Sequence, residues 1–344
     1  MRLLQLMAGA EEGGAENFFM RLANSLQKTL TDQELLVRPF KKREDFLKES
    51  SIKFSTAQFG GVWDFSTRKA VKEVIQKFEP DIVLSWMNRA TSFVPVQGRA
   101  NPFVHIGTPR GYYDPKYYKQ CDHLIVTTND LAKFYFNQGW KNDCVTVLQN
   151  FAPDFQTHPI SRKKFDTPEN VELILALGRF HKNKGFDVLL KSLALLPDCF
   201  LWLGGTGVIE QELKGQAHEL GVENRVRFLG WLENTAPFFA ASDIFVCSSR
   251  HEPFGNILIE AWLHKIPLVA AASEGPSQLI EHEKTGLLVP KEDHKAMANA
   301  ISRIKNDVAL KKSLASAGRE KYESKFTEEN VVSQYLDLFK RLVT

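Results

Sequence analysis

The stretch DIFVCSSRHEPFGNILIEAW, residues 243–262, decides the fold. It begins with the apolar run IFVC, continues through a polar loop that holds Pro253 and Gly255, and ends in a segment that opens a helix. A strand that is buried on both faces reads as a continuous apolar run, and such strands belong to parallel sheets that are covered by helices. The stretch therefore predicts one strand, loop and helix unit of a parallel α/β domain.

The same alternation of short apolar runs with longer periodic segments extends along the whole chain. The runs predict strands, and the segments between them, such as residues 16–30 and 68–78, predict helices. A polar, proline-bearing stretch that starts at Ala152 separates two series of strands and is the best candidate for a linker. The predicted strands are RLLQLMA, ELLVRPF, DIVLSWM, PFVHIG, HLIVTT and CVTVLQN in the first half, and ELILALG, CFLWLGG, VRFLG, DIFVCSS, PLVAAA and GLLVP in the second.

These patterns predict two Rossmann-like, doubly wound α/β domains that face each other across a cleft. We expect residues 1–155 to form the first domain and residues 165–325 the second. Residues 326–344 are expected to form a last helix that packs back towards the first domain, because Thr327, a residue type that favours helix starts, and Glu329 precede apolar residues at helical spacing. Ligands of open α/β sheets bind outside the carboxyl ends of the strands, so function is expected in the cleft.

The composition excludes several classes of protein. The 344 residues are 43% hydrophobic and 25% charged, with a net charge of +3. Residues 1–155 carry 20 Lys and Arg against 17 Asp and Glu, an excess too small for a nucleic-acid binder but suited to an anionic acceptor or membrane surface. No C-x-x-C pair, H-x-x-x-H pattern or acidic cluster indicates a metal site. No apolar stretch reaches the roughly 20 residues of a membrane span, so we expect a cytoplasmic protein that at most touches the inner face of the membrane.

Two glutamates in the opening stretch indicate a ligand with two polar ends. Glu252 precedes the helix, and Glu260 follows eight residues later. We therefore expect Glu260 to lie about two helical turns beyond Glu252, at a distance of roughly 12 Å. A carboxylate accepts paired hydrogen bonds from vicinal hydroxyls, so the two could hold a sugar and a ribose. The backbone amides of Phe254, Gly255 and Asn256 lie at the expected helix N-terminus, where a phosphate or a developing negative charge is favoured. The alternative is that both are ordinary surface glutamates.

A second cluster, GRFHKNKGFD, places Arg179 and Lys184 after a strand and before a helix. Arg can bind a diphosphate through two hydrogen bonds and Lys adds a mobile charge, so together they could neutralise a leaving group without a metal. Solvated surface cations are the alternative for such a pair.

Weaker features are each open to a functional and a structural interpretation. The glycine turns at Gly204–Gly207 and Gly13-Gly14 either present amides to a phosphate or only allow a tight turn. His105, at the end of the strand PFVHIG, either binds a sugar hydroxyl or is structural. The segment RPFKKREDFLK, residues 38–48, is a basic stretch that either lies on an anionic membrane or is a solvated charge run.

Nearly the whole chain resembles the retaining glycosyltransferases of family four, which have the two-domain GT-B architecture. The resemblance rests on GGAE near the start, GRFHKNKGFDVLL, GGTG, RVRFLGW, EPFGNILIEA and SEGPSQLIEHEKTGLLVP. Within the family the chain is similar to bacterial envelope members that build lipopolysaccharide core or related surface glycans. It departs from the family at Lys265, where glycine is usual, and after His105, where IGTPRGYY replaces a familiar pattern.

The resemblance implies a metal-independent, retaining hexosyltransferase that needs no cofactor beside its nucleotide-sugar donor. It moves a hexose or N-acetylhexosamine from a nucleoside-diphosphate sugar to an envelope glycan or glycolipid, and an anionic membrane is a further expected partner. The resemblance implies that Arg179 and Lys184 bind the donor diphosphate and that Glu260 binds the ribose. Glu252, with the amides of Phe254, Gly255 and Asn256, would bind the transferred sugar. Gly14 would lie by the donor phosphates, and His105 of the first domain would lie near the sugar. Two alternatives stay open: a nucleotide-sugar epimerase on the same architecture, and a non-catalytic nucleotide-sugar-binding protein.

Overall fold

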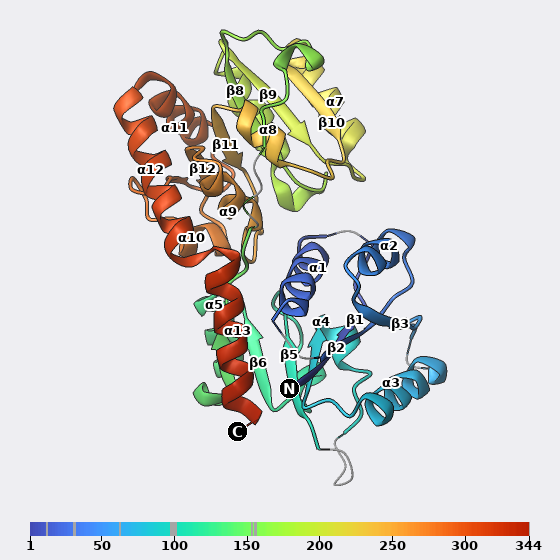
Figure 1. Cartoon of the computed structure of the whole chain (residues 1–344). Coiled ribbons are helices and arrows are strands. Elements are labelled where there is room, and N and C mark those ends of the chain that lie inside the picture. The colour runs from blue at the N-terminus through green and yellow to red at the C-terminus, as the bar shows by residue number, and fades with distance from the viewer. Residues whose placement is uncertain are drawn as a thin grey trace. The chain divides into compact units, whose positions relative to one another are not determined.

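The protein consists of two compact units (Figure 1). The computed structural model describes residues 1–11, 13–29, 32–61, 63–96, 102–152, 154 and 157–343. The first unit comprises Met1–Phe151 and Glu328–Thr344, and the second comprises Ala152–Thr327. Each unit is a parallel sheet with helices packed against it, which confirms the two-domain, Rossmann-like fold class.

The first unit is built on a parallel sheet in the order β3-β2-β1-β4-β5-β6-β7 among the described residues. The six predicted strands are present, and the structure adds an edge strand, β3 (Lys53–Thr56), whose sequence KFST is too short and too polar to be recognised as an apolar run. The other strands are β1 (Arg2–Met7), β2 (Asp32–Val37), β4 (Ile82–Trp86), β5 (Val104–Thr108), β6 (His123–Val126) and β7 (Val145–Val147). The helices are α1 (Gly14–Gln27), α2 (Lys41–Glu49), α3 (Phe65–Phe78), α4 (Met87–Thr91), α5 (Asn129–Asn137) and α13 (Glu328–Val343), with the short 3-10 helices η1 (Pro115–Tyr118) and η2 (Asn142–Cys144).

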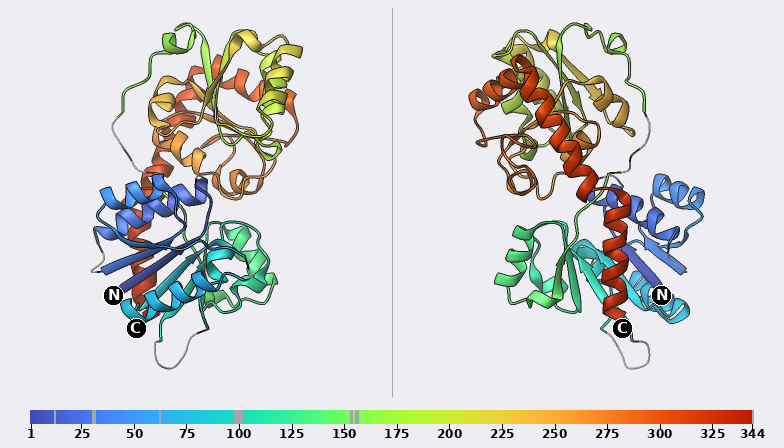
Figure 2. Two further views of the ribbon diagram at one scale, coloured as in Figure 1. Left: turned by 90° about the vertical axis from the view of Figure 1, so that its right-hand side faces the viewer. Right: turned by 60° about the vertical axis from the view of Figure 1, so that its left-hand side comes forward.

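The last helix, α13, completes the core of the first unit (Figure 2). Its apolar residues share a buried cluster with Phe18 and Phe19 of α1 and with Trp86 of β4. The Ser25 hydroxyl of α1 also donates to the Glu328 carboxylate over 2.8 Å. The chain therefore returns to its first unit after forming the second. The buried residues of α13 are Val331, Val332, Tyr335, Leu338 and Phe339.

The second unit repeats the architecture with a sheet in the order β10-β9-β8-β11-β12-β13 among the described residues. Chain order runs outwards from β8 to β10 on one side and from β11 to β13 on the other, so the winding reverses between β8 and β11. The strands are β8 (Glu172–Leu177), β9 (Cys199–Gly204), β10 (Val226–Gly230), β11 (Ile244–Cys247), β12 (Leu268–Ala271) and β13 (Leu287–Val289). The helices are α6 (Phe186–Ala194), α7 (Glu210–Glu219), α8 (Ala236–Ala241), α9 (Asn256–Leu263), α10 (Glu274–Leu279), α11 (His294–Asn306) and α12 (Val308–Lys325), with the 3-10 helices η3 (Arg162–Phe165), η4 (Lys182–Lys184) and η5 (Glu223–Arg225).

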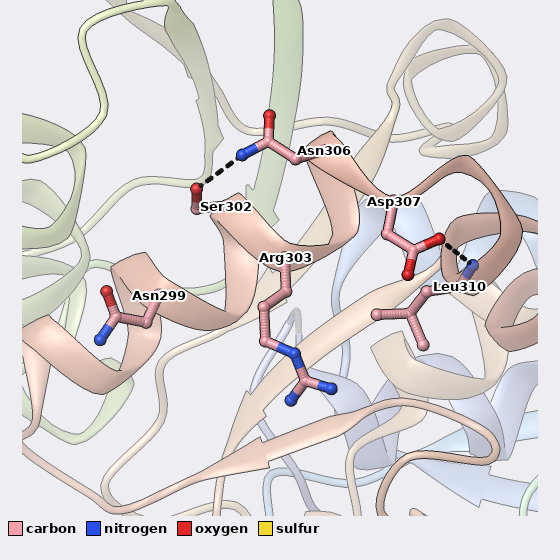
Figure 3. Close-up of a pocket in the computed structure, with 6 residues that line it drawn as sticks. All are labelled: Asn299, Ser302, Arg303, Asn306, Asp307 and Leu310. Carbon is pink, nitrogen blue, oxygen red and sulfur yellow. Dashed lines mark hydrogen bonds between the residues drawn. The ribbon is translucent and has the colours of Figure 1, made fainter.

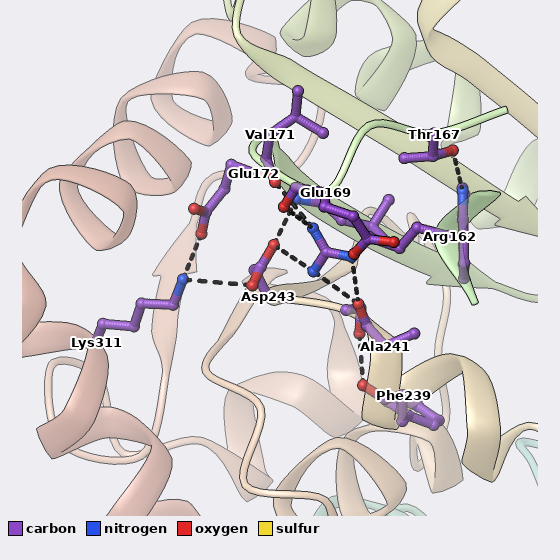
Figure 4. A network of polar contacts seen from close by, with 12 residues as sticks. Arg162, Thr167, Glu169, Val171, Glu172, Phe239, Ala241, Asp243 and Lys311 are labelled. Atoms are coloured by element: carbon purple, nitrogen blue, oxygen red, sulfur yellow. Dashed lines mark hydrogen bonds and ion pairs between the residues drawn. The ribbon is translucent and has the colours of Figure 1, made fainter. Parts of the chain in front are cut away.

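The stretch that the sequence suggested as a linker is largely part of the second unit (Figure 4). Arg162 donates to the carbonyl oxygen of Ala241 over 2.8 Å and pairs with Asp243 over 2.9 Å. Asp243 also accepts the amide of Leu173 on β8 over 2.8 Å. Arg162, a partly buried cation with several acceptors, fixes this segment to the sheet. The second unit begins at Ala152 and not at the predicted residue 165. Residue 155, the predicted end of the first domain, lies outside the described residues.

Lys265, which departs from the family's usual glycine, adopts a left-handed conformation with a φ of 56°. It follows α9, and its amide donates to the carbonyl oxygen of Trp262 over 3.1 Å. Helices commonly end on such a residue, and glycine takes this conformation without the steric cost that a side chain carries. The departure therefore affects a helix end and not a binding residue.

Candidate functional site

The predicted donor residues lie at the point where the winding of the second sheet reverses. The loop after β8 carries Arg179 and Lys184, and the loop after the neighbouring strand β11 carries Glu252. In open α/β sheets the crevice beside this reversal is where ligands bind. The sequence motifs therefore come together because β8 and β11 are adjacent, although some 70 residues separate them.

Lys184 and Glu252 form an ion pair at this point. The side chains are 26% and 13% exposed. Burial lowers the pKa of the Lys184 ammonium, but the charge and hydrogen bond of Glu252 outweigh it, so the pKa stands above its ordinary value. The Ser249 hydroxyl lies 3.4 Å from the same Glu252 carboxylate oxygen. The site thus holds a fixed positive charge beside a fixed carboxylate.

Backbone contacts fasten the two loops together. The Ser248 hydroxyl donates to the carbonyl oxygen of Lys184 over 2.8 Å, and the amide of Arg250 donates to that of Asn183 over 2.7 Å. Gly185, with a φ of 63°, sits so close that a Cβ would lie 2.2 Å from the Ser248 carbonyl oxygen. Only glycine fits there, and its place in the motif sets the position of Lys184.

Arg250 is a residue of the site that the sequence reasoning missed. Its guanidinium binds both carboxylate oxygens of Asp187 over 2.7 Å and also pairs with Glu292. Such paired hydrogen bonds give geometric precision as well as charge pairing. Arg250 therefore ties the start of α6 to the loop after β11. It stands within the motif SSRHEP, but no local pattern names its partners, which are 63 and 42 residues away.

The start of α10 supports Glu252 from the other side and was also missed. The amide of Gly275 donates to the Glu252 carbonyl oxygen over 2.7 Å, and the Glu252 amide donates to the Glu274 carboxylate over 3.2 Å. The second oxygen of Glu274 lies 3.0 Å from His251 Nδ1. A Cβ on Gly275 would lie 2.2 Å from the Phe254 carbonyl oxygen. The string SEGP thus positions the loop that presents Glu252.

Glu260 lies on α9, closer to the helix start than the sequence suggested. The helix begins at Asn256, so four residues separate its start from Glu260 and correspond to a rise of about 6 Å. The expected 12 Å of helix between the two glutamates is wrong because Glu252 belongs to the preceding loop. The Glu260 carboxylate accepts a hydrogen bond from the Thr235 hydroxyl over 2.9 Å.

The backbone amides of Phe254, Gly255 and Asn256, which were predicted to face an anionic ligand, lie at the start of α9. Gly255 adopts a φ of 96° and leads directly into Asn256, and as a glycine it has no side chain with which to cap the helix. Phe254 is buried, with 6% of its surface exposed, and anchors the loop in the core. The arrangement places a helix N-terminus next to Glu252, which suits an anionic ligand.

The glycine turn after β9 supports the Arg179 loop by packing. A Cβ on Gly205 would lie 1.9 Å from the Gly178 carbonyl oxygen, and one on Gly207 would lie 2.3 Å from that of Phe180. The amide of Phe180 donates to the Thr206 carbonyl oxygen over 2.8 Å. The structure therefore supports the structural interpretation of these glycines. Arg179 itself is exposed, whereas its neighbour Phe180 is buried.

The predicted phosphate loop of the first unit surrounds one of its own carboxylates. Glu16 is 9% exposed, and its carboxylate accepts the amide of Ala10 over 3.0 Å. A Cβ on Gly13 would lie 2.3 Å from that carboxylate. Gly14, the residue implied to lie by the donor phosphates, is the first residue of α1. The glycines thus leave room for Glu16 in this structure.

His105 does not lie where the sequence placed it. It is the second residue of β5, near the amino end of the strand, and is 1% exposed. Its Nε2 lies 2.9 Å from the Ser85 hydroxyl, and its Nδ1 lies 3.3 Å from the Gln120 carbonyl oxygen. Burial lowers the pKa of the imidazole to about 4. The expectation that it faces a ligand at the carboxyl end is wrong, because the strand continues to Thr108.

The basic segment of residues 38–48 forms α2 and the turn before it. Its apolar residue Leu47 is fully buried. Arg43 is also buried, donates to the carbonyl oxygens of Ala10 and Arg38, and lies over the Phe40 ring. These side chains belong to the first unit's own packing and are not available as anchors in a membrane.

Two further observations concern the described residues. No helix among them is long and apolar enough to cross a membrane, and no three His, Cys, Asp or Glu side chains among them are grouped to hold a metal ion.

A depression of about 450 Å³ lies where α11 meets α12 (Figure 3), and its polar side chains cap or brace these helices. It is separate from the donor residues and is lined by Asn299, Ser302, Arg303, Asn306, Asp307 and Leu310.

Comparisons with known proteins agree with this arrangement. Residues 158–321 match the family described as glycosyl transferases group 1. Over 342 residues the chain is 34% identical to the lipopolysaccharide core biosynthesis glycosyltransferase LpsD of Rhizobium meliloti, with 99% of this chain and 98% of the relative covered. The glycosyltransferase LpsE of the same organism is 33% identical, with 95% and 96% covered.

A solved structure shows the same fold. Alr3699/HepE of Anabaena, in complex with UDP-glucose, superposes with a TM-score of 0.86 at 20% identity and covers 99% of this chain and 100% of its own. At that identity the likeness concerns the fold alone. Together with the full-length relatives and the two parallel α/β units, it leads to one conclusion: the chain belongs to the group 1 glycosyl transferases and has the GT-B architecture.

Proposed function

We propose that this glycosyltransferase is a retaining, metal-independent enzyme of lipopolysaccharide core synthesis, which moves a hexose or N-acetylhexosamine from a nucleoside-diphosphate sugar to the growing core. The proposed acceptor class is supported by the names of two relatives, the lipopolysaccharide core biosynthesis glycosyltransferases LpsD and LpsE. The donor class is supported by HepE, which was solved with UDP-glucose.

The observation that carries the proposal is the Lys184–Glu252 ion pair beside the start of α9. A sugar diphosphate has an anionic end and a hydroxyl-rich end. Lys184 and the exposed Arg179 would bind the diphosphate, while Glu252 would accept hydrogen bonds from the transferred sugar. Glu260, one turn into α9, would accept hydrogen bonds from the ribose hydroxyls. These bonds would replace the hydrogen bond that it accepts from the Thr235 hydroxyl.

In the proposed reaction the bond between the anomeric carbon and the diphosphate oxygen breaks, and the acceptor oxygen bonds to the same face of that carbon. The acceptor proton passes to the departing diphosphate. Negative charge grows on the diphosphate in the transition state, and Lys184, Arg179 and the α9 amides stabilise it by electrostatics that are already in place. These cations supply the charge for which other enzymes use a metal ion.

We further propose that the enzyme works in the cytoplasm and meets its lipid-linked acceptor at the inner face of the membrane. Exposed Lys41, Lys42 and Lys48 on α2 offer positive charge for an anionic surface. Because Leu47 is buried, this contact would be electrostatic. Sedimentation with anionic vesicles should then fall steeply as the salt concentration rises.

A transfer assay tests the proposal. Lipopolysaccharide from cells that lack this transferase is incubated with UDP-, GDP- and ADP-sugars, and the product is analysed by mass spectrometry and by NMR of the new anomeric proton. We expect transfer from one donor class with retained configuration and undiminished activity in the presence of a chelator. An inverted product would contradict retention, and loss of activity with the chelator would contradict metal independence.

The same assay separates the alternatives. A donor-only incubation that yields an epimerised nucleotide sugar would support an epimerase. Donor binding without transfer or hydrolysis would support a non-catalytic binding protein.

A further inference from the structure

Two large aromatic side chains of the first unit are exposed to solvent. Trp63, in the connection between β3 and α3, is 82% exposed, and Phe65, the first residue of α3, is 66% exposed. Their ring centroids are 6.3 Å apart. We call Phe59 to Gly61 together with Trp63 to Phe65 the aromatic turn. At these exposures the two rings contribute little to the core, so folding does not explain them.

The aromatic turn is nevertheless held firmly. The Asp64 carboxylate accepts the Gly60 amide over 2.7 Å, the Ser66 hydroxyl over 2.6 Å and the Thr67 amide over 2.9 Å. Phe59 is fully buried with a φ of 48°, and its amide donates to the Thr67 hydroxyl over 3.0 Å. A left-handed conformation is costly for such a residue and persists where surrounding contacts enforce it. Trp63 and Phe65 are therefore presented from a preformed support.

Two arginines flank the aromatic turn. Arg89 donates to the Phe59 carbonyl oxygen over 3.3 Å, and Arg68 lies 5.3 Å from the Phe93 ring centre. Phe93 in turn packs edge-on against Phe59 at 5.6 Å. Both arginines are exposed. The turn follows β3 at the carboxyl edge of the sheet, the edge at which open α/β sheets bind ligands.

We propose that the aromatic turn is an acceptor subsite, in which Trp63 stacks on a sugar ring of an anionic oligosaccharide while Arg68 and Arg89 bind its phosphate or carboxylate groups. This inference rests on the proposed function, which supplies an oligosaccharide acceptor, and the two exposed arginines indicate that the part bound here is anionic. An indole face matches the apolar C–H face of a pyranose, and a guanidinium matches phosphate or carboxylate geometry.

The chemistry of the turn favours a sugar over a lipid bilayer. Asp64 lies between Trp63 and Phe65, and the hydrogen bonds of Ser66 and Thr67 hold its pKa well below the usual range. Insertion of both rings into hydrocarbon would bring this carboxylate out of water, which is costly. Stacking against a hydrated oligosaccharide leaves it solvated.

The test compares one acceptor in two forms: intact lipopolysaccharide in vesicles, and lipid-free core oligosaccharide, both from cells that lack this transferase. For Trp63→Ala we expect the KM of both acceptors to rise about tenfold, as for loss of an aromatic anchor, with the donor KM unchanged and kcat within about twofold. Trp63→Phe should fall between wild type and Trp63→Ala. Val308→Ala, an exposed apolar position on α12, is the matched control and should change neither KM.

The outcomes are distinct. An unchanged KM for the lipid-free oligosaccharide overturns the subsite, and an effect confined to vesicles assigns Trp63 to membrane contact instead. Saturation-transfer NMR of the oligosaccharide with wild type and Trp63→Ala reads binding without turnover. Absence of transfer by wild type with every donor would count against the proposed function, whereas loss of the NMR signal in Trp63→Ala would still support the subsite.

Discussion

The two sheets share a topology, but the loops at their carboxyl edges carry different side chains. In the second unit, loops after β8 and β11 bring Lys184 and Glu252 into an ion pair beside the start of α9. In the first unit, the corresponding loop after β1 surrounds its own carboxylate, Glu16, and the expected histidine is buried near the amino end of β5. The same fold therefore carries a charged, preformed site in one unit and a self-satisfied loop in the other.

This difference has a chemical reason. Every nucleoside-diphosphate sugar offers a ribose, a diphosphate and a sugar, so a fixed set of charges at fixed loops can bind the whole class. Acceptors share no such common group, so we expect their recognition to depend on surface features such as the proposed aromatic turn. We expect substitutions in the second unit to affect the use of every donor, and those in the first to affect one acceptor or stability.

The largest effect is expected for Lys184→Ala. The change removes the cation proposed to stabilise the departing diphosphate and leaves Glu252, 13% exposed, without that partner. We predict that kcat/KM falls by about 100-fold or more, measured in the transfer assay with saturating acceptor. Lys182→Ala, in the same short helix but exposed, is the matched control and should stay within about twofold of wild type. Equal activity of both variants would argue against a role for Lys184.

Glu260→Ala should have the next largest effect. Loss of a carboxylate that binds two ribose hydroxyls removes charge-assisted hydrogen bonds, each about 1.5–3 kcal/mol, so nucleotide affinity should fall at least tenfold. Equilibrium binding of the nucleoside diphosphate measures this directly. Glu219→Ala, at the exposed end of α7, provides the comparison; a similar loss in that variant would point to general electrostatics instead of ribose binding.

A smaller, more specific effect is expected for Glu274→Gln. The amide keeps an acceptor near the Glu252 N–H but loses the negative charge that pairs with His251. We predict a fall in kcat of about fivefold with unchanged nucleotide affinity, because the change loosens the loop that presents Glu252. A weakened nucleotide affinity with normal kcat would instead place Glu274 on the nucleotide side of the site.

His105→Gln should alter stability more than catalysis. The folded pKa is about 4, below the unfolded value of about 6.5. Between these values only the unfolded state binds the proton, so the wild-type stability contribution is intact above pH 6.5 and declines by about 3 kcal/mol as the pH falls to 4. Denaturant unfolding from pH 7 to 4 should show a shallower decline for His105→Gln. A kcat reduced by tenfold or more at pH 7 would restore a catalytic role.

The smallest effect is expected at the end of α9. Lys265→Gly relieves a left-handed conformation and should raise the free energy of unfolding by about 1 kcal/mol. Activity should not change, since the side chain contacts none of the donor residues in the described structure. A destabilised variant would mean that the Lys265 side chain contributes more than the strain it carries.

Local patterns were sufficient to predict the fold and to gather the donor residues. Continuous apolar runs predicted each strand except the polar edge strand β3, and motifs on adjacent strands brought Lys184 and Glu252 together. Arg250 and Glu274 could not be predicted, because their partners lie far along the chain. His105 was misplaced because a strand's true end cannot be read from an apolar run that continues into Gly107 and Thr108.

We propose that the second unit divides the binding of its ligand between two residues, with Lys184 on the diphosphate and Glu260 on the ribose. Calorimetric titration of UDP, GDP and ADP against UMP, GMP and AMP tests this division directly. We expect wild type to bind one nucleoside diphosphate at least tenfold more tightly than its monophosphate. Lys184→Ala should lose this preference, and Glu260→Ala should weaken the binding of both nucleotides equally. A preference retained in Lys184→Ala, together with wild-type affinities in Glu260→Ala, would contradict it.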